Sequence, residues 1–65
     1  MTGKERIIAT GDDEKLIFTR HGEKMWTRVR IQNGQMVSMG HETTGSVEAE
    51  LKLLSDWDIQ RIGNK

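Results

Sequence analysis

Basic and aromatic residues alternate in the segment "WTRVRI", where Trp26, Arg28 and Arg30 occupy every second position. Alternate residues of a strand point to the same face, so this spacing predicts a face with one indole ring and two guanidinium groups. Such a face can bind single-stranded DNA or RNA, because arginines hold the phosphates while a base stacks on the ring. The same residue types are enriched at the centres of protein interfaces, and they also occur on solvated sheets where arginines lie over a tryptophan. The residues alone leave these three interpretations open.

The other titratable residues do not have the spacing of a metal or catalytic site. The acidic segment "GDDE" at 11–14 lacks the pattern of oxygen ligands in an EF-hand and has the composition of a turn. His21 and His41 are far apart, and no cysteine is present to complete a zinc site with them. We therefore predict no metal, no cofactor and no enzymatic activity.

Length and composition predict one small domain over residues 1–65. A chain this short buries a thin core, and the absence of cysteine excludes disulfides as its stabilising device, so self-association is expected. The chain has no apolar run long enough for a membrane span and no signal-peptide core, which predicts a soluble, cytoplasmic protein. Ten basic residues balance ten acidic ones, which argues against indiscriminate binding of nucleic acid.

The apolar periodicity changes from two residues to about three and a half along the chain. We predict an α+β fold, in which one helix packs on one face of an antiparallel sheet of four or five strands. The strands are predicted near 6–10, 15–20, 25–31 and 35–40, and the helix near 46–57. Residues 58–62 fit either a short last strand or the end of a helix, and their alternation favours the strand.

Two turns determine which side chains share a face of this sheet. Asn33-Gly34 is a strong hairpin signal, and a three-residue loop over 32–34 with Gly34 as a bulge is favoured because a two-residue loop would mix apolar and charged side chains. A two-residue loop at His21-Gly22 is predicted for the preceding hairpin. The apolar face predicted from these registers consists of Leu16, Phe18, Met25, Val29, Ile31, Val37 and Met39.

The opposite face then carries the candidate binding residues. Lys15 would lie opposite Arg28, and two like charges across neighbouring strands destabilise a sheet unless an anion binds between them. The residues predicted to bind a protein partner or a nucleic acid are Lys15, Ile17, Lys24, Trp26, Arg28, Arg30 and Met36.

The segment "LIFTRHGEKMWTRVRIQNGQMVSMGHETTGSVEAELKLL" resembles the YegP-like family of small domains, and "RVRIQNGQMV" carries most of the likeness. The family's tyrosine-arginine-aromatic pattern is represented by Trp26-Thr27-Arg28-Val29. This resemblance implies a sheet covered on one side by a helix, as tandem repeats or as a dimer of single copies, and it implies no activity. The order of four strands and a helix is also similar to that of transcription-coactivator and Pur-repeat binders of single-stranded nucleic acid.

The sequence thus predicts a small non-enzymatic interaction module that acts as a homodimer or binds a protein partner through its outer sheet face. The alternative is a protein that binds single-stranded DNA or RNA through the basic and aromatic residues of that face. A third alternative, a small phage-type inhibitor of a host protein, is consistent with the length alone.

Overall fold

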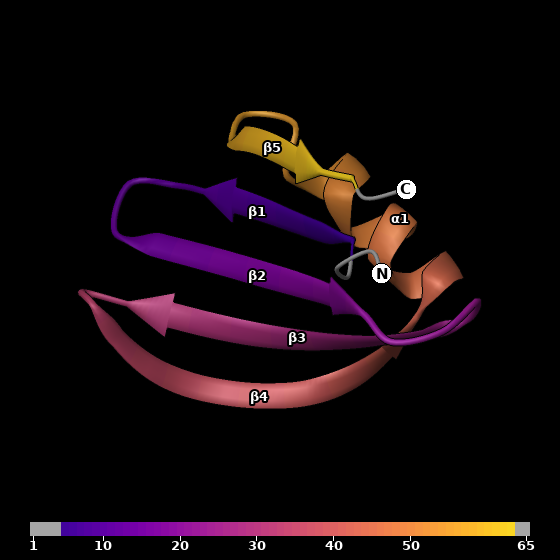
Figure 1. The fold of residues 1–65 in the computed structure, drawn as a ribbon. Helices are drawn as coiled ribbons and strands as arrows, with labels where there is room; N and C mark the ends of the chain where they lie inside the picture. Colours follow the sequence, from indigo (N-terminus) through magenta and orange to yellow (C-terminus); the bar gives the residue numbers. More distant parts are fainter. Residues whose placement is uncertain (1–4, 64–65) are drawn as a thin grey trace.

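The computed structural model describes residues 5–63 as a five-stranded antiparallel sheet with one helix packed on it (Figure 1). The elements are β1 (Arg6–Thr10), β2 (Glu14–Arg20), β3 (Met25–Gln32), β4 (Gln35–Thr43), α1 (Thr44–Leu53) and β5 (Asp58–Ile62). In space the strands follow the order β4-β3-β2-β1-β5. The predicted α+β fold is confirmed, with residues 58–62 as a fifth strand. No helix in residues 5–63 has the length and apolar character that a membrane span requires.

The chain builds the sheet as a meander and then returns to its first strand. β1, β2 and β3 are each paired with the strand that follows, which is the arrangement that short hairpin connections favour. After β4 the helix crosses one face of the sheet, and β5 pairs antiparallel with β1 at the opposite edge. β4 therefore forms one edge of the sheet and β5 the other.

The connection between β2 and β3 is longer than the predicted two-residue loop, and the predicted register is wrong. Arg20 lies opposite Trp26, where the sequence had predicted Glu23. The side chain of Arg20 holds this connection, because its Nε donates to the carbonyl of Gly22 at 2.8 Å and its Nη2 to that of Glu23 at 3.0 Å. The register differs from the predicted one by an odd number of residues, so every side chain of β3 points to the other face.

The turn between β3 and β4 is a two-residue loop, so the predicted three-residue loop is also wrong. Asn33 and Gly34 both have positive φ, 53° and 81°, as a type I′ turn requires, and Gln32 pairs with Gln35. The extra residue lies further along β4, where the register shifts between Arg30 and Ile31 and leaves Val37 as a bulge. The bulge restores an even register, so that Val29 pairs with Met39.

Substitution Gly34→Ala is expected to lower the free energy of unfolding by about 1–2 kcal/mol, because an L side chain is disfavoured in the left-handed region. Space does not limit this position, since a Cβ on Gly34 would meet no atom within 4 Å. Urea unfolding followed by circular dichroism measures the loss. Gly34→Asn is the matched control, since asparagine tolerates this conformation better, and equal stability of Gly34→Ala and the unchanged protein would contradict the turn assignment.

The core lies between the sheet and the helix. Trp26, Phe18, Ile7 and Val47 are the largest fully buried side chains, and the remaining buried residues are Ala9, Leu16 and Leu51. Of the predicted apolar face, only Leu16 and Phe18 lie in this core. The prediction is wrong for the others because of the β2–β3 register. The residues that it misplaced are Met25, Val29, Ile31, Val37 and Met39.

The helix begins two residues before the predicted start. Thr43 is its N-cap, and Oγ1 of Thr43 accepts a hydrogen bond from the backbone N–H of Ser46 at 3.1 Å. Val47 and Leu51, one turn apart, are the buried residues of the helix. Trp57, which lies after the helix, packs at the margin of the core.

Candidate functional site

The face of the sheet opposite the helix carries a row of apolar side chains across four neighbouring strands. Ile8 pairs with Ile17, Ile17 with Val29, and Val29 with Met39. Directly opposed residues of antiparallel strands point to the same face, so these four side chains lie side by side. Ile31 and Met36 form a second opposed pair next to the row. We call the surface made by Ile8, Ile17, Val29, Ile31, Met36 and Met39 the open face.

The apolar side chains of the open face are partly exposed in the chain as described. Ile8, Ile17, Val29 and Ile31 are half-buried by their neighbours, whereas Met36 and Met39 are 62% and 65% exposed. The helix lies on the other side of the sheet, where its buried residues belong to the core (Figure 1). A contiguous apolar patch on a small protein is typical of an interaction site, whereas isolated apolar residues on a surface are common.

The predicted binding residues do not share one face. Lys15, Ile17 and Met36 lie on the side of the open face, and Lys15 opposes Ile31 rather than Arg28. Trp26, Arg28 and Arg30 lie on the side of the helix, because they alternate with Val29 and Ile31 along β3. Lys24 precedes β3 in the connection from β2. The predicted common surface is therefore wrong, and the cause is again the register of β2 and β3.

Trp26 is a core residue with a satisfied polar group. Its side chain is only 1% exposed, and its Nε1 donates to Oγ1 of Thr44 at 2.9 Å. Oγ1 of Thr44 in turn donates to the carbonyl of Glu23 at 2.7 Å, and the guanidinium of Arg20 lies 5.7 Å from the centre of the indole ring. The buried ring offers no face on which a base could stack.

Carboxylates hold the two arginines of β3. Arg28 Nη1 lies 3.0 Å from Oε2 of Glu50 in the helix and 3.4 Å from Oε2 of Glu42 in β4. Arg30 Nη2 lies 2.8 Å from Oε1 of Glu14, at the start of β2. These ion pairs compensate the positive charges of the two arginines, which had been predicted to bind phosphates. Two of the three carboxylates, those of Glu50 and Glu14, lie outside the β3–β4 hairpin.

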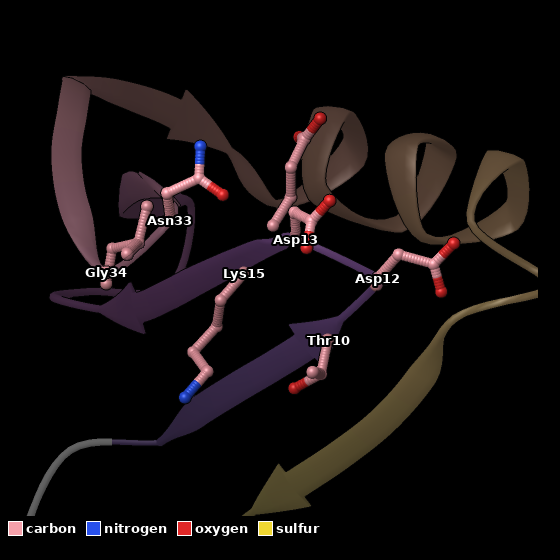
Figure 2. Close-up of a pocket in the computed structure, with 9 residues that line it drawn as sticks. Thr10, Asp12, Asp13, Lys15, Asn33 and Gly34 are labelled. Carbon is pink, nitrogen blue, oxygen red and sulfur yellow. The ribbon is translucent and has the colours of Figure 1, made fainter.

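An open cavity of about 300 Å³ lies where two turns meet at one end of the sheet (Figure 2). The β1–β2 turn and the β3–β4 turn are joined there by the backbone N–H of Asn33, which donates to the carbonyl of Asp13 at 3.0 Å. Figure 2 shows the side chains of Asp12 and Lys15 pointing in different directions. Residues 5–63 contain no group of three or more metal-ligating side chains. The arrangement supplies no convergent set of groups to which a reaction could be assigned.

The open face was missed as a continuous surface because Val29, Ile31 and Met39 had been assigned to the core. One signal in the sequence favours the observed arrangement, namely the size of Trp26 compared with its neighbour Met25. Of the two, the indole buries the larger apolar area, so a core that includes Trp26 is favoured, and Val29 and Ile31 then face outward.

The segment that resembles YegP-like domains covers β2, β3, β4 and α1, while β1 and β5 lie outside it. That resemblance stays a prediction from the residues. The order of strands and helix is common to many small domains, so it assigns no function by itself. Comparison with known proteins found no family model, no curated protein and no solved structure that matches this chain.

Proposed function

We propose that this protein is a small, non-enzymatic interaction module that uses its open face to bind a second copy of itself or another protein. The observation that carries the proposal is the apolar row Ile8, Ile17, Val29 and Met39, which crosses four of the five strands on the side away from the helix. Burying such side chains in a partner contributes free energy in proportion to the apolar area removed from water.

The distribution of polarity on this side of the sheet is typical of an interface. Its centre is aliphatic, whereas two polar residues border the apolar row: Lys15, which lies opposite Ile31, and Thr10, which lies opposite Lys15. Protein interfaces commonly have a core depleted of charge and a polar rim that remains accessible to water. The arrangement therefore supports a protein partner over a charged polymer.

Binding of single-stranded nucleic acid and inhibition of a host protein stay predictions, as does the cytoplasmic location. The ion pairs of Arg28 and Arg30 and the burial of Trp26 remove the specific support for the first of these. Titration with an oligonucleotide at low salt, followed by amide chemical shifts, tests it directly, because phosphate contacts weaken steeply as salt is added.

Substitution Ile17→Lys tests the proposed function, because it places a charge at the centre of the apolar row. We expect the variant to remain folded and to lose association, measured by light scattering for self-association and by affinity capture for a protein partner. Leu53→Lys is the matched control, since Leu53 is an apolar residue that is 83% exposed on the helix, away from the open face. A protein that remains monomeric and whose Ile17→Lys and Leu53→Lys variants capture the same partners would contradict the proposal.

A further inference from the structure

One edge of the sheet carries few of the features that normally prevent strands from pairing with other chains. β4 has nine residues, is hydrogen-bonded to β3 on one side only, and runs along the outside of the sheet (Figure 1). Its first six residues, "QMVSMG", contain no charged side chain and no proline. Met36, Val37 and Met39 in this stretch are more than half exposed. Long uncharged edges of this kind are templates for an additional strand.

The other edge of the sheet has the usual protection. β5 has five residues, and it carries the charged side chains of Asp58 and Arg61. Arg61 also forms an ion pair with Glu48 of the helix at 3.5 Å. Short strands with charged residues discourage pairing, so an added strand is favoured at β4.

We propose that β4 of a second copy of this chain pairs antiparallel with β4, about a two-fold axis that passes between the two Gly40 residues. The bulge at Val37 ends regular pairing on one side, and the helix begins at Thr44 on the other, so the regular stretch is 38–43. With the axis perpendicular to the sheet, opposed residues point to the same side, which requires one residue to face the same residue of the other copy across the axis. Gly40 lies near the middle of the regular stretch.

This register is complementary in charge and in size. It places Ser38 opposite Glu42 of the other copy and Met39 opposite His41, each pair occurring twice, so that no two like charges are opposed. An axis between the two His41 residues would place two histidines opposite each other. An axis between the two Met39 residues would bring the bulged Val37 into the hydrogen-bonded ladder between the copies. Glycine within a strand often marks a close approach of another backbone, and Gly40 has no neighbouring atom within 4 Å of the position that a Cβ would occupy.

The edge contact goes beyond the proposed function, because it uses the rim of the sheet and leaves most of the open face uncovered. Both helices would lie on the same side of a continuous ten-stranded sheet. Met39 of each copy would lie diagonally across the axis from Met39 of the other, so the two apolar rows would lie on the same side of the sheet, offset by two residues along the strands. The dimer would thereby present an apolar surface about twice as wide as the open face of one copy.

Single cysteines test this register directly, because the chain contains none. Opposed residues in an antiparallel pair have Cα atoms about 4.5–5.5 Å apart, within the range that a disulfide spans. We expect Gly40→Cys to form a covalent dimer readily under mild oxidation, whereas Gln60→Cys, on the other edge strand, stays largely monomeric. Equal rates of cross-linking for the two variants, or a wild-type protein that remains monomeric at several hundred micromolar, would overturn the proposal.

Charge at Ser38 gives a second test that does not depend on a disulfide. Ser38→Glu would oppose Glu42 of the other copy twice, which is expected to raise the dimer Kd about tenfold. Ser38→Gln is the matched neutral control and is expected to leave the Kd within about twofold, because surface substitutions of this kind have small effects. Because Arg30 lies opposite Ser38 within the same chain, the new carboxylate has a favourable partner in the monomer, and the fold is retained.

The two surfaces can be told apart by comparing these variants with Ile17→Lys. Self-association lost in Ser38→Glu and retained in Ile17→Lys supports the edge contact and argues against self-association through the open face. The reverse result overturns the edge contact and supports the proposed function. An edge occupied by a different protein would leave the wild type monomeric, which overturns self-pairing.

Discussion

Replacing Trp26 with alanine is expected to lower the free energy of unfolding by about 3–5 kcal/mol, the usual cost of removing a buried aromatic side chain. Trp26 is 1% exposed and is the largest of the fully buried side chains. Domains of this length are stable by only about 3–10 kcal/mol, so the variant is expected to be largely unfolded or to melt far below the unchanged protein. Thermal and urea unfolding followed by circular dichroism measure the loss.

Trp26→Phe separates the packing of the ring from its hydrogen bond. Phenylalanine retains most of the apolar area but has no N–H for Oγ1 of Thr44, which accepts from the indole at 2.9 Å. A smaller loss of about 1–3 kcal/mol is therefore expected, from the lost bond and the incomplete filling of the site. If Trp26→Ala unfolded within about 0.5 kcal/mol of the unchanged protein, as exposed positions do, the assignment of Trp26 to the core would be wrong.

The existence and order of the elements could be predicted because each depends on local patterns. The alternation in β3, the Asn33-Gly34 turn and the helical spacing of Val47 and Leu51 are all contained in short stretches of sequence. The exact helix start was less predictable, since Thr43 and Ser46 are both good N-cap residues and tertiary packing decides between them.

The faces of the sheet could not be predicted in the same way. They depend on whether the number of residues between paired positions in each hairpin is odd or even. β3 offers Met25, Val29 and Ile31 on one side and Trp26 on the other, so its apolar pattern is compatible with either orientation. The hydrogen bonds of Arg20 to the carbonyls of Gly22 and Glu23 hold the longer connection before β3 in place. Local spacing contains no signal of that arrangement.

The same cause limited the prediction of the candidate site. The placement of Ile17 and Met36 on the face away from the helix agrees with the sequence-based assignment. The ion pair of Arg28 with Glu50 could not be inferred from the hairpin, since Glu50 lies in the helix and reaches Arg28 only after the helix has crossed the sheet. A pattern of basic residues on a strand therefore does not establish free positive charge.

Substitution Gly11→Ala is expected to lower the free energy of unfolding by about 1–3 kcal/mol, the usual cost of forcing extra atoms into a packed region. A Cβ on Gly11 would lie 2.8 Å from Cε2 of Trp57, which is closer than van der Waals contact allows. Trp57 is packed against the core, so its ring has limited freedom to move away. Gly11 thus permits the β1–β2 turn to lie against the indole.

A double-mutant cycle with Trp57→Ala distinguishes this contact from an effect on the backbone of the turn. Gly34 is the glycine with positive φ within residues 5–63, so the conformation of Gly11 is open to an alanine. In the Trp57→Ala background, Gly11→Ala is therefore expected to stabilise the protein by about 0.4–1 kcal/mol, because alanine restricts the unfolded chain. Urea unfolding of the four proteins gives the coupling energy between the two positions. An equal loss in both backgrounds would show that the turn itself, and not the indole of Trp57, excludes a side chain at Gly11.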